Sequence, residues 1–298
     1  MEWILLSATG LLGRVALERP YPQERMARSE DRRAAHDLIS SWAPCDDAGV
    51  AAVTSSGRAL LLDTTAIPVV DVSSTFSLEA GVPSARLLDL PDGERVVAVY
   101  SLDLSHPALA LGTLHGVAKR VVPEYKGWDE WEVIALKEGD VVLGAAPAAD
   151  TDELVFITSE GQLLRCPARS VRPQGRSAGG MAGVKLGEGA EAIAFAVVEA
   201  AHAEEALVVT QAAAPEGSHG PTTIKVSPFS AFPAKGRATG GVRCHRFTKG
   251  QDHLDLAWTG LPPARGSDPD GSFRNLPALD ERRDGSGTRV GLPMAFFG

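Results

Sequence analysis

The most regular feature of the chain is an apolar run, a polar turn that contains glycine, and a second apolar run. This unit is written ILLSATGLLGRVAL (4–17), VAAVTSSGRALLL (50–62), LALGTLHGVAKRVV (109–122) and LVFITSEGQLLRCP (154–167). The turn glycines are Gly10, Gly57, Gly116 and Gly161, which are 47, 59 and 45 residues apart. Glycine adopts a positive φ without a Cβ clash. Each unit therefore predicts a β-hairpin with a short turn.

A second pattern follows each hairpin and predicts a turn and one more strand. It is written LPDGERVVAV (90–99), LKEGDVVLGA (136–145), LGEGAEAIAF (186–195) and FTKGQDHLDL (247–256). Its glycines are Gly93, Gly139, Gly189 and Gly250. A repeat of roughly 50 residues with about four strands, present about six times, is typical of a β-propeller. Stacking such blades in a ring buries their faces and hides their edges.

The repeats predict one all-β domain over 1–298, with blades at about 1–45, 46–105, 106–150, 151–202, 203–259 and 260–298. The fifth hairpin is lengthened by AAAPEGSHGP (212–221). The sixth hairpin is the weakest and is expected within 262–279, with Asp270 and Gly271 in its turn. The polar segment 19–37 carries both charge signs and is expected to be a mobile loop. The pattern leaves open whether the ring closes.

Composition places the chain among soluble globular proteins. Hydrophobic residues make up 44 % and charged residues 22 % of 298 residues, which suffices for a buried core. There is no run of 18 apolar residues and no basic stretch ahead of the first apolar one, so neither a membrane span nor a signal peptide is expected. Cys45, Cys166 and Cys244 are scattered and odd in number, which favours a reducing cytoplasm over a disulfide framework.

The positive charge is confined although the net charge is −9. Neither 162–187 nor 217–251 contains an acidic residue, and together they hold eleven of the 29 Lys and Arg residues. The rest of the chain is therefore strongly acidic. Because equivalent positions of successive blades lie side by side in a propeller, the two windows predict one basic stripe along an arc of the ring. Such a stripe is typical of a phosphate-binding surface.

Each basic window contains the same Arg-Gly loop, QGRSAGG (174–180) and KGRATGG (235–241), and RRDGSGT (282–288) is a third version. Glycine-rich loops present backbone N–H groups to phosphate oxygens. A solvated strand face with turn glycines is the alternative for one window alone, but two windows in register favour phosphate binding. The candidate DNA-binding residues are Arg165, Arg169, Arg172, Gln174, Arg176, Lys185, Lys225, Lys235, Arg237, Arg243, Arg246 and Lys249.

The segments VRPQGRSAGGMAGVKL, FPAKGRATGGVR and VFITSEGQLLRCP resemble blades of the C-terminal domain of the A subunit of type IIA DNA topoisomerases. That family comprises gyrase and topoisomerase IV, and the likeness is greatest to an actinobacterial topoisomerase IV-like protein. The resemblance implies a six-bladed β-pinwheel, in which neighbouring blades exchange strands. It also implies that the rim binds and bends duplex DNA without sequence specificity. Implied partners are DNA, the remainder of the A subunit, and the B subunit, which carries the ATPase.

One departure from the family concerns the Q-R-R-G-G-K-G box with which gyrase wraps DNA. At the corresponding place the chain reads ERMARSEDRRAAHD (24–37), without glycine. This favours a topoisomerase IV-like role, guiding DNA for decatenation or relaxation, over gyrase-type wrapping for negative supercoiling, which is kept as the alternative. None of Tyr21, Tyr100 and Tyr125 follows an arginine, unlike the family's catalytic tyrosine, and there is no Walker A motif. We therefore expect no catalysis and no cofactor here, with ATP and Mg²⁺ bound by other parts of the enzyme.

Other functions were weighed against the same residues. A protein-binding WD40-type propeller predicts recurrent Trp-Asp pairs, and only Trp128-Asp129 occurs. A propeller hydrolase predicts His or Asp at one strand position in several blades, which is not seen. The sequence GEGAEA (187–192) fits a dinucleotide fingerprint but aligns with the turns of the second pattern. Cys244 and His245 lack partners at zinc spacing, and Trp128 and Trp131 are expected to pack between blades.

Overall fold

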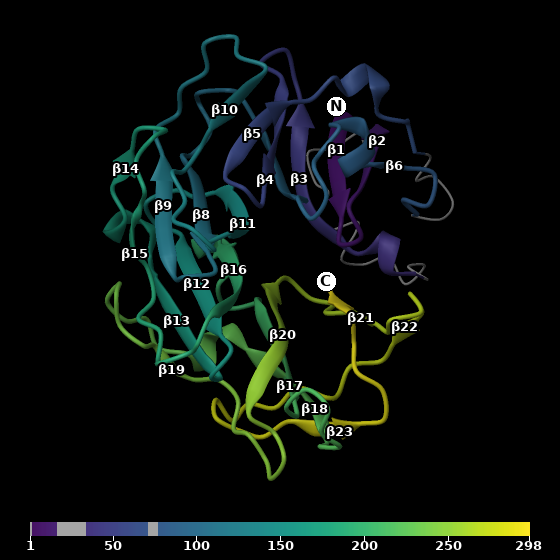
Figure 1. The fold of residues 1–298 in the computed structure, drawn as a ribbon, viewed down its shortest axis with the longest axis vertical. Helices are drawn as coiled ribbons and strands as arrows, with labels where there is room; N and C mark the ends of the chain where they lie inside the picture. Colours follow the sequence, from purple (N-terminus) through teal and green to yellow (C-terminus); the bar gives the residue numbers. More distant parts are fainter. Residues whose placement is uncertain (1, 17–33, 71–76) are drawn as a thin grey trace.

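Six small sheets stand around a central axis in the computed structural model, which describes residues 2–16, 34–70 and 77–298 (Figure 1). Each sheet is a blade, numbered here in chain order. The strands of blades 1 to 3 are β1 (Glu2–Ser7), β2 (Leu11–Ala16), β3 (Ile39–Cys45), β4 (Val50–Thr54), β5 (Arg58–Leu61), β7 (Val96–Ser101), β8 (Leu109–Thr113), β9 (Val117–Val121) and β11 (Val142–Pro147). The six-bladed all-β prediction is confirmed.

Blades 4 to 6 continue the same order. Their strands are β12 (Glu153–Thr158), β13 (Gln162–Pro167), β16 (Ala192–Val198), β17 (Leu207–Ala213), β18 (Thr222–Pro228), β20 (His253–Gly260), β21 (Gly266–Ser267), β22 (Phe273–Arg274) and β24 (Phe296–Phe297). In each blade the hairpin is followed by a third strand that pairs with the hairpin's first strand. The sixth hairpin is short, as its weak sequence pattern indicates. In the described ranges, the one α-helix is α2 (Ser84–Leu87).

The outer strand of blades 1 to 5 comes from the segment of the next blade. These exchanged strands are β6 (Val82–Pro83), β10 (Glu130–Glu132), β14 (Pro173–Gln174), β15 (Met181–Ala182), β19 (Val242–Arg243) and β23 (Thr288–Val290). They pair with β2, β5, β9 (both β14 and β15), β13 and β18, respectively. This is the strand exchange that the family resemblance implies, and it covers the outer edge of each of these sheets.

The turn glycines adopt the backbone conformation that the repeat predicts. Gly10, Gly57, Gly116 and Gly161 have φ between 76° and 83° in the first turns. The second series, before the third strand of blades 2 to 5, is also left-handed; its members are Gly93, Gly139, Gly189 and Gly250. Glycine is required here because a Cβ strains the left-handed region.

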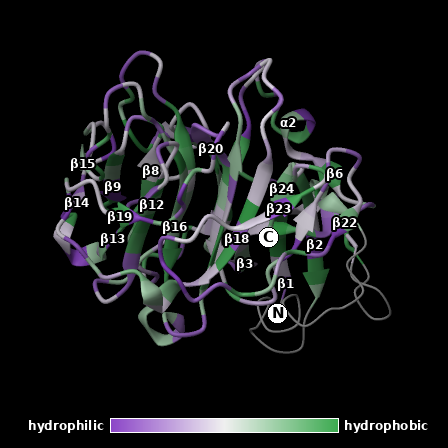
Figure 2. Ribbon diagram, turned by 90° about the horizontal axis from the view of Figure 1, so that it is seen from below, coloured by the Kyte–Doolittle hydropathy of each residue, from purple (hydrophilic) through white to green (hydrophobic). Residues whose placement is uncertain are grey.

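The hydrophobic core lies between neighbouring blades rather than at one centre. One cluster joins blades 2 and 3 through Val53, Leu111 and Trp131, and another joins blades 4 and 5 through Ile157 and Phe229. Figure 2 shows hydrophobic strands inside the ring and hydrophilic residues gathered in its loops. Each blade therefore holds its neighbours in place, and positions on successive rims are fixed relative to one another.

Blade 6 contacts the segment that precedes β3 of blade 1 and so completes the ring. The amide of Ala35 donates to the carbonyl of Gly271, 2.9 Å away, and Gly298 packs on Leu38. Blade 6 thus lies beside blade 1 (Figure 1). Most of the segment 19–37, including the place of the gyrase box, falls outside the described residues. Within the described part of the chain no helix is long and apolar enough to cross a membrane.

Candidate nucleic-acid interface

The Arg-Gly loops occupy equivalent places at the outer edges of three successive blades. We name them by the blade on which they pack: rim loop 3 (174–180), rim loop 4 (235–241) and rim loop 5 (281–287). Each ends at a glycine with a positive φ, Gly180, Gly241 and Gly287. A Cβ on any of these glycines would collide with a backbone oxygen of β9, β13 or β18, respectively. The glycines therefore let each loop lie directly on the strand beneath it.

Backbone hydrogen bonds join each rim loop to the chain that follows the neighbouring loop. The amide of Lys185, just beyond rim loop 3, donates to Thr239 of rim loop 4 at 3.0 Å. The amide of Arg246, at the equivalent position one blade further on, donates to Gly285 of rim loop 5, also at 3.0 Å. The outer edges of blades 3 to 5 thus form one continuous backbone surface, which we call the basic rim.

The structure places most of the sequence-predicted residues on or near this rim. Seven of them are exposed: Arg169, Arg172, Lys185, Lys235, Arg243, Arg246 and Lys249. Four are partly buried: Arg165, Gln174, Arg176 and Arg237. The exposed group follows the rim from β13 to the turn before β20, so it offers cationic side chains on two neighbouring blades.

The structure corrects the expectation for Lys225 and shows that Arg165 is engaged within the protein. Lys225 is 1 % exposed, and its ammonium bonds to Ser227 and to the carbonyl of Arg283, so it does not reach the surface. Arg165 lies over the ring of Phe229, 4.5 Å from its centroid, and beside Glu153 at 3.3 Å. Both residues lie on strands that are covered by an exchanged strand. A basic residue in an acid-free window of the sequence therefore need not be exposed at the surface.

Arg176 of rim loop 3 is held against the protein. Its guanidinium carbon lies 3.8 Å from the centroid of the Trp128 ring, and its Nε is 3.6 Å from a carboxylate oxygen of Glu124. Trp131 is buried in the cluster between blades 2 and 3, as expected, and Trp128 packs against that cluster. A phosphate that recruits Arg176 must therefore compete with Glu124.

Glu124→Gln is accordingly expected to tighten duplex binding by about two- to fivefold, the range of a surface ion pair. The substitution removes the competing carboxylate and leaves the Trp128 ring beneath Arg176. Titration of a labelled duplex at low salt measures the change. Glu138→Gln, which removes an exposed charge that forms no ion pair with Arg176, is the matched control. Equal effects of the two substitutions would contradict a specific role of Glu124.

Sequence reasoning missed Lys119, which anchors rim loop 3 from below. This lysine is fully buried, and its ammonium donates to the carbonyls of Arg176 and Ala178 at 2.6 and 2.7 Å. Burial lowers the pKa of Lys119 to about 8. The sequence did contain a signal for this role, which is the repeat itself. Lys119 and Lys225 stand at the same place in the second hairpin strand of their blades.

The edge of blade 2 holds an arginine that pairs with two acids, whereas Arg246 of the basic rim pairs with one, Asp284, at 2.9 Å. Arg58 lies between Glu94 and Glu130, with N–O distances of 2.6 and 2.5 Å, and hydrogen bonds to both carboxylates raise its pKa. A phosphate that approached Arg58 would also be repelled by the carboxylates of Glu94 and Glu130. Arg58 therefore offers a phosphate less free positive charge than the exposed cations of the basic rim.

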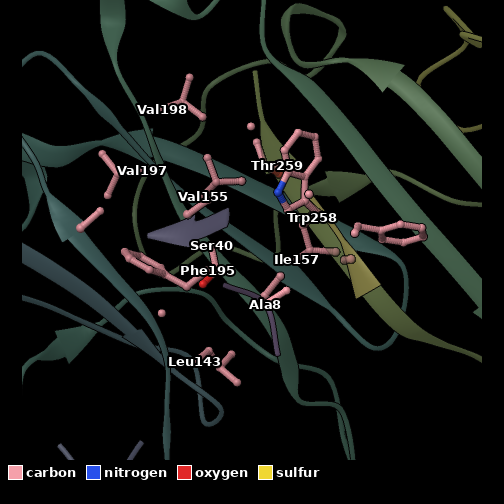
Figure 3. Close-up of a pocket in the computed structure, with 18 of the residues that line it drawn as sticks. Ala8, Ser40, Leu143, Val155, Ile157, Phe195, Val197, Val198, Trp258 and Thr259 are labelled. Carbon is pink, nitrogen blue, oxygen red and sulfur yellow. The ribbon is translucent and has the colours of Figure 1, made fainter. Parts of the chain in front are cut away.

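The axis of the ring holds an apolar cavity of about 540 Å³. Its wall is formed by the third strands of the blades, with Leu143, Phe195 and Trp258 among the lining side chains (Figure 3). No His or Asp recurs at one strand position of this wall in the described residues, in contrast to a propeller hydrolase. Asp46, Asp103 and His106 lie close enough together to hold a cation, in loops of blade 2 away from this cavity.

Together, the six sheets and the exchanged outer strands define a six-bladed β-pinwheel. The family model described as the DNA gyrase C-terminal domain, beta-propeller, matches residues 152–199 and 223–255, which include β12 to β16 and parts of β18 and β20. The sequence-based recognition of this resemblance is thereby confirmed.

Curated relatives of the chain include A subunits of gyrase. The DNA gyrase A subunit of Staphylococcus aureus strain MRSA252 is 28 % identical over 164 residues, covering 53 % of this chain and 18 % of that protein. The protein of strain NCTC 8325 matches with the same figures. The chain thus aligns with less than a fifth of the length of the curated relatives it matches.

Solved structures share the fold over nearly the whole chain. The C-terminal domain of DNA topoisomerase IV has a TM-score of 0.72 at 15 % identity, covering 98 % of this chain and 89 % of that one. The DNA gyrase A C-terminal domain has a TM-score of 0.64 at 16 % identity, covering 99 % and 98 %. The chain therefore has the architecture of the accessory C-terminal domain of a type IIA topoisomerase A subunit.

Proposed function

We propose that the chain binds duplex DNA along the basic rim without reading base sequence. The observation that carries the proposal is the continuity of the rim: three equivalent loops are joined by backbone bonds, and exposed cations line them. Arginine and lysine side chains and backbone amides contact phosphates, which positions a duplex but conveys no sequence information. The relatives are parts of DNA-acting enzymes, which supports the same partner.

The binding is expected to be strongly salt-dependent. Seven exposed cations and the partly buried Arg176 and Arg237 give about 6–10 phosphate contacts, and such a number loses roughly 10³–10⁵ in affinity between 50 and 200 mM salt. Titration of a duplex of about 40 base pairs over this range measures the slope. Duplexes of unrelated sequence serve as the control and should bind equally. An affinity indifferent to salt would overturn the proposal.

We further propose that the bound duplex is bent only partly and is guided toward the catalytic gate, as in topoisomerase IV. Bending a site of about 20–30 base pairs costs on the order of 1–6 kcal/mol. Arg58 of blade 2 is already paired with two acids, so DNA phosphates would gain little attraction there. This supports a DNA path along the rim that does not extend past blade 3 to blade 2. The chain acts within a larger A subunit that works with an ATPase-bearing B subunit, in the cytoplasm and near the nucleoid. It contributes binding rather than catalysis and holds no cofactor of its own.

The activity of the whole enzyme separates this role from the gyrase-type alternative. A holoenzyme that carries this domain should decatenate and relax DNA and should lose both activities in part when the rim is neutralised. The readout is the distribution of topoisomers with ATP present. Efficient introduction of negative supercoils would instead establish gyrase-type wrapping and would leave rim binding itself intact.

A further inference from the structure

Two buried lysines lie beneath rim loops at the same position of the fold. Lys119 of β9 bonds to the carbonyl of Arg176 in rim loop 3, and Lys225 of β18 bonds to that of Arg283 in rim loop 5. Both are at most 1 % exposed, and no carboxylate bonds to either ammonium in the described residues. Burying an ammonium is costly unless hydrogen bonds satisfy it. The loop carbonyls supply those bonds.

These bonds fix the direction of the loop peptides. In a trans peptide the N–H points away from the C=O of the same unit. With the carbonyls of Arg176 and Ala178 turned inward to Lys119, the amides of Ser177 and Gly179 point outward. Both residues are exposed, and neither amide has an acceptor among the described residues. Neighbouring outward amides form a concave donor site for an anion.

Blade 4 provides an internal contrast. Leu164 stands where the other two blades have lysine, and it is fully buried. In rim loop 4 the counterpart of Ser177 is Ala238, which has a φ of 62°, and its amide donates to the carbonyl of Gly183 at 2.6 Å. Without the lysine, this amide is bonded within the protein. The orientation of the peptide thus varies with the residue beneath it.

We propose that Lys119 is a positioning residue that turns the backbone amides of rim loop 3 outward to bind phosphate oxygens of the duplex, and that Lys225 holds the backbone of rim loop 5 in place through the carbonyl of Arg283. The inference rests on the proposed function, because the anion it assigns is the DNA backbone. Each lysine also places a positive charge directly beneath its loop. Neither lysine touches DNA, so each acts through the loop that it holds.

Proton uptake distinguishes this role from simple packing. Burial lowers the pKa of Lys119 to about 8 and also lowers that of Lys225. The charged group that acts on Lys119 is Glu132. The groups that act on Lys225 are Asp280, Asp284, Arg282 and the thiol of Cys244, which is neutral. Phosphate favours the protonated ammonium, so duplex affinity must fall as the pH rises through about 8.

The test is the duplex affinity of the whole chain from about pH 6.5 to about pH 9.5 at constant ionic strength. The wild-type protein should lose about tenfold in affinity over this range, as expected for the loss of a charge near a phosphate. Lys119→Met with Lys225→Met, which fills the same space without charge, should bind about tenfold more weakly at neutral pH and show a flat profile. Thermal unfolding checks that this variant is folded.

Lys235→Met is the matched control, because Lys235 is an exposed lysine of rim loop 4. It should lower affinity and the salt slope and leave the pH profile unchanged. A flat profile of the wild-type protein, or the same fall in the double variant, would overturn the positioning role while salt-dependent binding stands. Absence of duplex binding at every pH would instead overturn the proposed function. The wild-type profile alone decides the question should the double variant not fold.

Discussion

Replacing Lys185 and Arg246 together by glutamate is expected to abolish most duplex binding. Both side chains are exposed, and both residues donate their amides to the next rim loop, so they mark the same point on two successive blades. Charge reversal removes two phosphate contacts and adds two repulsions. The slope of log affinity against log salt should become shallower by about 2, and affinity at low salt should fall roughly 100-fold.

The position of the charge matters more than its amount in this prediction. Arg86→Glu makes an equal charge change per site on α2, at the edge of blade 1, where no Arg-Gly loop packs. This control should alter affinity less than about twofold, because exposed charges farther apart than about 10 Å are largely screened. If Arg86→Glu weakened binding as much as Lys185→Glu, net charge rather than the basic rim would govern the interaction.

The fold was predictable where a physical constraint is local. A hairpin turn that needs a positive φ needs glycine, and Gly57, Gly116 and Gly161 therefore marked the hairpins in the sequence. The third strands were equally visible after their own turn glycines. The outer strands were not, since β14, β15 and β19 are only two residues long and a pattern that short has no periodicity. Their exchange between blades was expected from the family resemblance alone.

The location of the basic rim was predictable from the sequence, but the burial of its individual residues was not. Acid-free windows and repeated loops located the rim loops on blades 3 and 4. Burial of individual cations depends on which strand an exchanged segment covers, and that is a long-range property. Lys119 and Arg120 sit side by side in β9 and are both buried, with Arg120 bonded to Asp150 and to backbone carbonyls. Successive side chains of a strand point to opposite faces, so the sequence would predict that one of these two residues is exposed.

A second large effect is expected from Gly241→Ala, which should destabilise the domain by about 2–4 kcal/mol and weaken duplex binding. Gly241 has a φ of 73°, a region that costs an L-residue about 1–2 kcal/mol. An added Cβ would also overlap the carbonyl of Leu163, so β19 would have to move off β13. That movement carries Arg243 with it and breaks the bond between Thr239 and Lys185. Thermal or urea unfolding measures the first effect and duplex titration the second.

Two glycines of the same chain separate the causes of this effect. Gly217 has a φ of 77°, and a Cβ added to it would meet no atom within 4 Å, so Gly217→Ala should cost only the backbone strain of about 1–2 kcal/mol. Gly236 lies in rim loop 4 itself, with open space around it and no positive φ, so Gly236→Ala should be near neutral. Only Gly241→Ala combines strain with a collision against the supporting strand. If all three variants lost the same stability, contact between the rim loop and β13 would not be what shapes the interface; if only Gly241→Ala lost both stability and binding, that contact is the means by which the fold presents the rim to DNA.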